Sequence, residues 1–382
     1  MKKSSIWLCL LFMGLWLLSG CSGQERSTVA DELPSTLTIS AQMPEEYPQT
    51  VTKYQVDWCN VEEETAKNIL MRNEATQREE WAQGPMLRAE GDGVDETLML
   101  LQTVTPGGLI YHWETAETAR IFDDCDKLRK HRPYEYTGDS LSQSLGNLEM
   151  EEYPAEEDLS FLPYTEAKSQ LEKTMAACGM PSLEIYFSEC HTQDLMNKNL
   201  EIYNNALTLP ENAWIDTGEP IELFTTAEEH YYFAYRQVQD GIPFTSAIWP
   251  RSVRSEATET VVTALVSEDG LIELKANGLY TIGEALGSCT LISPQEAVNV
   301  YVEEYTQAIH FENTCISGVE LNYVVVKDGE SYIARPAWML TLETDKTTEE
   351  TSEQAAYDYV EFQTLAVSAD TGIILERETD TR

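Results

Sequence analysis

The chain has 382 residues, of which 66 are Asp or Glu and 25 are Lys or Arg, so its formal net charge is -41. Hydrophobic residues make up 42% of it, which is enough for a large core and excludes a wholly disordered acidic chain. The charge also argues against a nucleic-acid-binding protein, because such a surface repels phosphate groups.

The first 20 residues are organised like a secretion signal. Lys2 and Lys3 precede an apolar run at 6–18, which is short for a transmembrane helix but suits a signal peptide. The run leads into Leu-Ser-Gly-Cys at 18–21, which resembles the lipobox of bacterial lipoproteins. The resemblance implies that Cys21 is lipidated and anchors the mature protein on the outer side of the cell membrane. An ordinary signal peptide, with Cys21 there by chance, is the alternative.

Residues 21–50 are rich in Ser, Thr, Pro, Gln and Glu, a composition that predicts a flexible tether. Residues 51–135 predict a small α+β domain, and the polar, acidic stretch 136–162 predicts a linker. The elements expected within the small domain are a strand at 51–58, a helix at 61–78, a hairpin from 96–103 and 109–113, and a helix at 116–130.

The rest of the chain contains an approximate internal repeat, with one copy at 163–290 and the other at 291–382. Each copy predicts a helix followed by three or four antiparallel strands that end near a glycine turn. In the second copy Ser293 is a good N-cap, Pro294 suits the first helical position, and Glu296 completes a capping box. The sequence therefore predicts an α+β fold in which antiparallel sheets are each packed by a helix.

Four short motifs in this half resemble two groups of extracytoplasmic proteins, the PepSY-type module and the YycH/YycI-type regulators of sensor kinases. The resemblance covers roughly residues 160–380 and implies repeated PepSY/YycI-like units in a lipoprotein of a Gram-positive bacterium. Both groups are regulators or modules that bind other proteins, which implies a similar role here. The motifs are Gln-Asp-Gly-Ile-Pro at 239–243, Ser-Pro-Gln-Glu-Ala at 293–297, Pro-Ala-Trp at 336–338, and Ala-Asp-Thr-Gly-Ile at 369–373.

A search for catalytic and metal-binding patterns assigns no catalytic residue, metal or cofactor. The five histidines are scattered, and signatures of zinc proteases, serine hydrolases, phosphate loops and dinucleotide sites are missing from the sequence. The acidic, Gly-rich stretch 91–96 lacks the alternating acids of a calcium loop. A solvated turn is the leading interpretation of that stretch, and weak calcium binding is the alternative.

Six cysteines follow Cys21 at long and irregular spacings. Buried free thiols are the leading interpretation, and disulfides outside the cytoplasm remain open. Cys190 is adjacent to His191, and adjacent residues of a strand point to opposite faces, which argues against a nucleophile–base pair. The six are Cys59, Cys125, Cys178, Cys190, Cys289 and Cys315.

Aromatic side chains gather on one expected strand, which contains Tyr231, Phe233 and Tyr235, and Trp249 follows after the next turn. The leading interpretation is that the strand packs these rings against a helix. The alternative is an exposed aromatic strip, with Trp249, that binds a peptide or glycan partner.

Together these patterns predict a lipid-anchored, extracytoplasmic, non-enzymatic binding or regulatory module. Its expected partners are membrane lipid through Cys21 and an envelope protein or peptide. Two alternatives stay open, namely an envelope hydrolase acting on peptide or glycan without a recognisable signature, and a protease-inhibiting or chaperone module.

Overall fold

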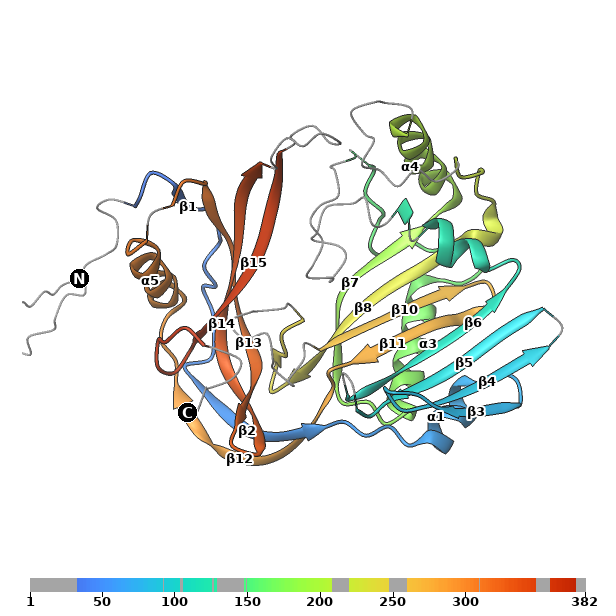
Figure 1. The fold of residues 1–382 in the computed structure, drawn as a ribbon, viewed down its shortest axis with the longest axis horizontal. Coiled ribbons are helices and arrows are strands. Elements are labelled where there is room, and N and C mark those ends of the chain that lie inside the picture. Colours follow the sequence, from blue (N-terminus) through green and yellow to red (C-terminus); the bar gives the residue numbers. More distant parts are fainter. Residues whose placement is uncertain are drawn as a thin grey trace, which may run out of the picture. The chain divides into compact units, whose positions relative to one another are not determined.

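Figure 1 shows the fold in a computed structural model. The structure describes residues 33–375 except 92, 104–105, 126, 129–147, 149, 208–219, 247–259, 309 and 348–357. Two β-sheets dominate this part of the chain, and nearly all of their strand pairs are antiparallel. From Pro34 onward the chain forms one compact unit.

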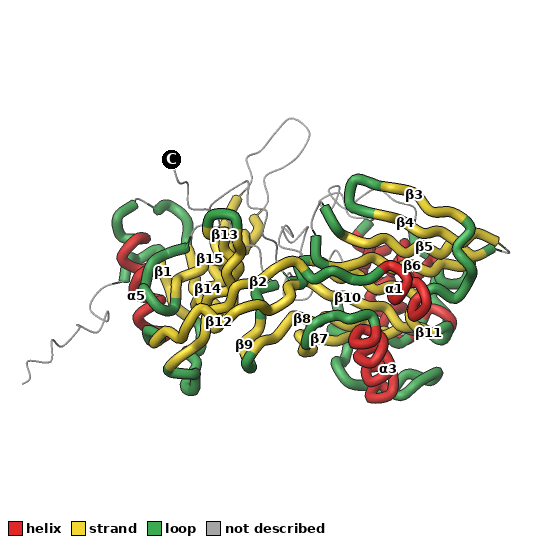
Figure 2. Tube along the Cα trace, turned by 90° about the horizontal axis from the view of Figure 1, so that it is seen from below, coloured by secondary structure: helices red, strands yellow, loops and turns green. Residues whose placement is uncertain are grey.

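The first sheet has nine strands in the order β3-β4-β5-β6-β11-β10-β8-β7, with β9 paired to β8. Helices α1 (Glu63–Leu70) and α3 (Tyr164–Ala177) lie side by side on one face of this sheet (Figure 2). The strands are β3 (Gln77–Glu80), β4 (Pro85–Gly91), β5 (Val94–Leu101), β6 (Gly108–Thr115), β7 (Leu183–His191), β8 (His230–Gln239), β9 (Ile242–Pro243), β10 (Val261–Ser267) and β11 (Gly270–Asn277).

The second sheet has six strands in the order β1-β13-β14-β2-β12, with β15 also paired to β14. Helix α5 (Pro294–Tyr305) packs on β14 and β15, and β1 is parallel to β13. The strands are β1 (Leu37–Ile39), β2 (Thr50–Trp58), β12 (Tyr280–Thr290), β13 (Thr314–Asp328), β14 (Ser331–Thr347) and β15 (Asp358–Ser368).

The α+β fold with antiparallel sheets packed by helices is confirmed. Both repeat helices lie where the sequence predicts them, and the capping box of α5 is present, with the Ser293 hydroxyl accepting from the Glu296 N–H at 3.2 Å. In the larger sheet, strand β6 pairs with β11. Strands from 51–135 and from 163–290 therefore share one sheet, and the sheet boundaries do not follow the expected boundary between these ranges.

The helix expected at 61–78 is wrong beyond Leu70, because Met71 is extended and β3 follows at Gln77. The cause is a tertiary contact with Glu96, which is fully buried on β5. Its carboxylate accepts the Arg72 N–H at 2.7 Å and the Asn73 N–H at 3.0 Å. These bonds hold the two N–H groups away from helical partners and end the helix.

The helix expected at 116–130 is present in part, since residues 119–120 and 127–128 are α-helical on either side of a π-helical turn, Ile121–Cys125. One more expectation needs correction. The described end of the expected 136–162 linker packs on the sheet, because Tyr153 and Leu159 are buried and the Leu159 N–H donates to the Tyr231 hydroxyl at 2.7 Å. The acidic composition of 136–162 predicts a linker, but the few apolar side chains within it bury their surface against the rest of the protein.

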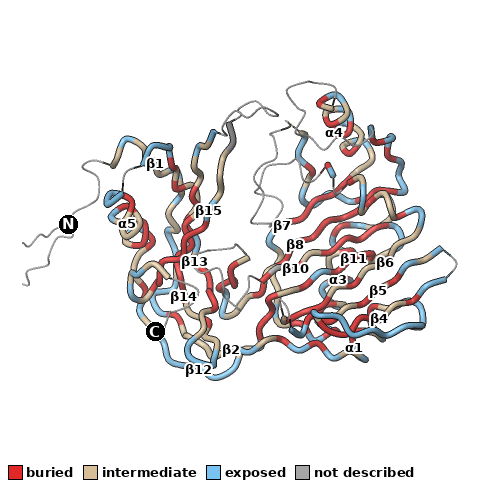
Figure 3. Tube along the Cα trace, in the orientation of Figure 1, coloured by how far each residue is buried: buried red, intermediate tan, exposed pale blue. Residues whose placement is uncertain are grey.

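The main core lies between the nine-stranded sheet and its two helices, and Figure 3 shows the buried residues concentrated along the central strands.

All six cysteines after Cys21 are free thiols, and four of them are buried. Burial raises the pKa of Cys178 to about 11 and that of Cys190 to about 12, so these thiols stay protonated and unreactive at neutral pH. Within the described residues, no helix is long and apolar enough to span a membrane.

The Ala-Asp-Thr-Gly motif forms a turn that ties the six-stranded sheet together. Asp370 lies 3.1 Å from the Lys53 ammonium and 2.8 Å from the Arg335 guanidinium, and it accepts a hydrogen bond from the Ser368 hydroxyl. Burial alone would raise the pKa of Asp370, but the bonds from Ser368, Arg335 and Lys53 outweigh it and lower the pKa to about 2. The motif therefore stabilises the fold through an ionised carboxylate.

We expect Asp370→Asn to lower the free energy of unfolding by about 1–2 kcal/mol at pH 7, after allowance for solvent screening of the cations. The folded-state pKa is below the ordinary value of about 4, so this stability is complete above that value and is lost as the pH falls toward 2. Urea denaturation at pH 7 and pH 2.5 should show the gap between wild type and variant closing. A gap of equal size at both pH values would contradict this account.

Candidate functional site

Helix α4 (Gln193–Ala206) and the chain around it form a polar surface at the end of the nine-stranded sheet. The helix begins where the Thr192 hydroxyl accepts the Leu195 N–H at 3.4 Å. Its apolar face, which includes Met196, Leu200 and Tyr203, is buried in a small core of its own. This core is separate from that of the large sheet and fixes the orientation of the helix.

Two asparagines of α4 hold an extended segment at 221–224. Asn197 accepts the Phe224 N–H at 2.8 Å and donates to the Phe224 carbonyl at 3.0 Å. Asn204 forms the same pair of bonds with Ile221, at 3.1 and 2.9 Å. Seven helical residues rise about 10 Å, which matches three residues of extended chain, so both pairs form without distortion.

A third asparagine holds a different extended segment on the other side of α4. Asn199 is fully buried, accepts the Glu151 N–H at 2.7 Å and donates to the Glu151 carbonyl at 3.0 Å. Helix α4 is therefore a brace between two extended segments, and each is held through backbone groups.

Arg120 fixes the segment at 221–224 from another direction. Its guanidinium donates to the carbonyls of Glu222 at 2.7 Å and Leu223 at 3.2 Å, and lies 4.8 Å from the centre of the Phe224 ring. It also donates to the Glu228 carboxylate at 2.6 Å. Burial raises the pKa of Glu228, but the hydrogen bonds from Thr225 and the charge of Arg120 outweigh it and lower the pKa overall.

Buried histidines lie beneath this brace. The His191 Nε2 lies 2.9 Å from the Glu189 carboxylate oxygen Oε2. The His191 ring stacks on the rings of Tyr153 and His230, with ring centres 3.8 and 4.3 Å apart. His230 contacts the Glu228 carbonyl at 2.8 Å. Cys190 is adjacent to His191 on β7, so the two point to opposite faces, and the arrangement forms a structural polar cluster.

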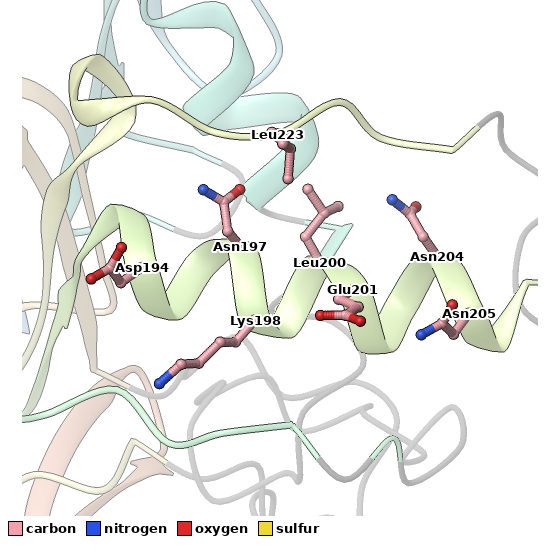
Figure 4. A pocket seen from close by; sticks show the side chains of 8 residues that line it. All are labelled: Asp194, Asn197, Lys198, Leu200, Glu201, Asn204, Asn205 and Leu223. Atoms are coloured by element: carbon pink, nitrogen blue, oxygen red, sulfur yellow. The ribbon is translucent and has the colours of Figure 1, made fainter.

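A hollow of about 530 Å³ follows the exposed side of α4. Figure 4 shows Asn197, Leu200 and Asn204 directed toward the segment that holds Leu223, with Lys198 and Glu201 on another side of the helix. Leu223 is 72% exposed. We call this hollow the α4 groove, and its lining residues are Asp194, Asn197, Lys198, Leu200, Glu201, Asn204, Asn205 and Leu223.

The α4 groove combines charged side chains with an exposed leucine on a rigid wall. The asparagine and arginine bonds fix the wall before any ligand arrives, which reduces the ordering cost of binding. Because the Asn197 and Asn204 amides are already bonded to the chain, the charged side chains of Asp194, Lys198 and Glu201 would meet a polar partner, and Leu223 would meet an apolar group.

The aromatic residues singled out in the sequence lie elsewhere. Tyr231, Phe233 and Tyr235 are buried in the main core. There the Tyr164 ring of α3 packs on two of them, with its centre 5.9 Å from the centre of the Tyr231 ring and 5.7 Å from that of Phe233. An exposed strip of these three residues is therefore wrong, because α3 covers their face of the sheet. Trp249 and Cys21 lie outside the described residues.

Glu96, the last residue of the stretch at 91–96, is also committed to the fold, since both of its carboxylate oxygens accept protein donors, including the Tyr111 hydroxyl at 2.9 Å. In the part of the chain that the structure describes, no three His, Cys, Asp or Glu side chains gather as metal ligands would.

Sequence reasoning missed the α4 groove. The available signal was the density of Asn between 193 and 206, since Asn is a poor former of helix interiors. The seven-residue spacing of Asn197 and Asn204 places both on one helix face, which predicts a shared partner.

The chain matches no family model and no curated protein. Among solved structures, an uncharacterized protein from Eubacterium rectale ATCC 33656 is similar, with a TM-score of 0.54 and 12% sequence identity over 90% of this chain and 91% of that chain. A likeness at this identity concerns the fold alone.

The asparagine brace predicts site-specific amide exchange. We expect Asn204→Ala to speed hydrogen exchange of the Ile221 amide, and Asn197→Ala that of the Phe224 amide, by about tenfold each, because each loses its acceptor. A general loosening of α4 would not explain the faster exchange, because Ala has a higher helix propensity than Asn and each substitution should stabilise the helix itself. Lys198→Ala is the control on the exposed side of the same helix and should change neither amide. Unchanged exchange of the Ile221 and Phe224 amides in both asparagine variants would show that Asn197 and Asn204 do not hold the segment at 221–224.

Proposed function

We propose that the chain is a lipid-anchored, extracytoplasmic binding module that holds an envelope protein or peptide in the α4 groove. The observation behind the proposal is the groove's rigid wall, in which Asn197, Asn204 and Arg120 fix the segment with the exposed Leu223. Pre-organised surfaces with an apolar centre and a charged rim favour protein partners.

The amino-terminal sequence supports the location. The Leu-Ser-Gly-Cys stretch after a short apolar run resembles a lipobox, and a diacylated cysteine is a stable membrane anchor. The flexible tether expected at 21–50 is wrong from Pro34 onward, because Leu37–Ile39 form β1 of the six-stranded sheet and Leu37 is buried. A tether confined to residues before Pro34 would still let the body meet partners near the membrane. The net charge of the whole chain, -41, favours partners with a basic surface.

The resemblance to PepSY-type and YycH/YycI-type proteins supports a regulatory role for this binding. All four motifs behind that resemblance have structural roles. Asp240 and Gly241 form the turn between β8 and β9, and the Trp338 indole donates to the Ile292 carbonyl at 3.1 Å. Ser293 and Glu296 form the capping box of α5, and Asp370 pairs with Lys53 and Arg335. The motifs therefore support a similar fold, and the proposed regulatory role depends on the identity of the partner.

The proposal is tested by photo-crosslinking in intact cells from position 223. A crosslinking amino acid in place of Leu223 should capture one reproducible envelope partner, because this side chain projects from the groove. The matched control is position 81, where Trp81 is 52% exposed beside β3 at the opposite edge of the sheet.

In the same cells, Cys21→Ala should release the protein from the membrane fraction and abolish the crosslink, because both depend on the anchor. An identical pattern of products from positions 223 and 81 would argue against the groove as a binding site. Retention of the Cys21→Ala protein on the membrane would argue against the lipid anchor.

A further inference from the structure

Strand β3 is an end strand of the nine-stranded sheet, and its outer edge is open. All four of its residues are exposed. Within the described residues, no strand pairs with β3 on the side away from β4. The chain on both sides of it is described, from residue 33 to residue 91. A further strand can therefore add at this edge without displacing a described part of the protein.

The backbone bonds at the end of β3 reveal which of its groups face outward. Trp81 donates its N–H to the Gly84 carbonyl at 3.0 Å and accepts the Gly84 N–H at 3.1 Å, so its backbone faces the β4 side. The N–H and C=O of a strand residue point to the same side, and that side alternates along the strand. Because β3 and β4 pair without a register shift, Arg78 and Glu80 direct their backbone groups toward the open edge.

The two faces of β3 carry different side chains. Arg78 donates to Glu63 of α1 at 2.9 and 3.0 Å and also to Glu80, so these two strand residues lie on the face that α1 covers. Glu79 and Trp81 lie on the opposite face, where the Trp81 indole donates to the Glu79 carboxylate at 3.0 Å. Trp81 is 52% exposed. A carboxylate beside an open indole ring attracts the side chain of Lys or Arg.

The charges on β3 select the partner. A second copy paired antiparallel, with Arg78 opposite Glu80, would set Glu79 opposite Glu79, and like charges in that position destabilise a strand pair. The Arg78 guanidinium is already held by Glu63 and Glu80. A segment with Lys or Arg opposite Glu79 replaces the repulsion by attraction, and the net charge of the whole chain, -41, favours such a segment.

We propose that a basic, extended segment of a partner protein adds to β3 as an antiparallel strand. Its backbone bonds Arg78 and Glu80, and one of its Lys or Arg side chains lies against Glu79 and Trp81. In such additions the main-chain bonds supply affinity and the side-chain contacts supply specificity. This surface goes beyond the function proposed above, since the α4 groove follows β7 at the other end of the sheet (Figure 1).

The test measures, by fluorescence anisotropy, how tightly the full chain binds a labelled, end-capped octapeptide in which Val and Lys alternate. Opposite residues of an antiparallel pair share a face and alternate between hydrogen-bonded and non-hydrogen-bonded positions. A Lys opposite Glu79 is non-hydrogen-bonded, so the Val N–H groups bond β3 and the Lys N–H groups point away. N-methylation of the two central Val residues should weaken binding about tenfold, and N-methylation of the two central Lys residues should leave it unchanged.

The two methylated peptides have the same composition and charge, and their comparison does not depend on the folding of a protein variant. Equal affinity of all three peptides would show attraction by charge alone and overturn the proposal. Weaker binding of the Lys-methylated peptide than of the Val-methylated one, or no binding of the unmethylated peptide, would overturn it as well.

Two protein variants separate the local contact from the general charge. Glu79→Gln removes one charge but keeps an oxygen for the Trp81 indole, and it should bind the unmethylated peptide about threefold more weakly. Glu303→Gln is the matched control, because it removes one charge from an exposed position on α5 in the other sheet and should leave the affinity unchanged. Equal affinities of the two variants would contradict the contact with Glu79.

Crosslinking from position 223 reports independently on the α4 groove. Glu79→Gln should leave the product from position 223 unchanged, and the products from position 81, beside β3, should differ from it. Loss of the product from position 223 with the peptide preference retained concerns the proposed function alone. Equal affinity of the three peptides with that product retained overturns only the inference about β3.

Discussion

Buried backbone groups must find hydrogen-bond partners wherever the chain leaves a sheet, and in this protein side-chain amides meet that need. Gln237 on β8 is the central example. It is fully buried, donates to the Tyr280 carbonyl and accepts the Tyr280 N–H, both at 2.8 Å. Strand β8 belongs to the nine-stranded sheet and Tyr280 to β12 of the six-stranded sheet, so this one side chain links the two sheets.

The turn after β8 reinforces the same link. Phe244 stacks on Tyr280 with ring centres 5.9 Å apart and pairs with Tyr323 of β13 in an isolated bridge. Arg236 joins Glu184 on β7 to Glu320 on β13 at 3.0 and 2.8 Å. Because the same amide chemistry recurs where α4 holds Phe224, Ile221 and Glu151, one principle stabilises both the junction of the sheets and the wall of the α4 groove.

Much of the fold follows from the sequence, because its signals are local. The cap at Ser293, the positive-φ turn at Gly241 and the strand-favouring aromatic run of β8 each act within a few residues, so the elements around them are predictable. The contact of Glu96 with the end of α1 and the bonds of Asn197 and Asn204 join parts of the chain that lie 17 or more residues apart. The sequence around each of these side chains does not identify the distant segment that it bonds, which is why the helix end and the α4 groove escaped prediction.

The claim that an amide side chain joins the two sheets is tested most directly by amide hydrogen exchange at Tyr280 in Gln237→Ala. The matched control is Gln239→Ala, which changes the same residue type on the same strand at a partly exposed position. We predict exchange of the Tyr280 amide that is about tenfold faster in Gln237→Ala and unchanged in the control, with unfolding of the two sheets no longer coincident. Equal protection of Tyr280 in both variants, with a single shared unfolding transition, would contradict the claim.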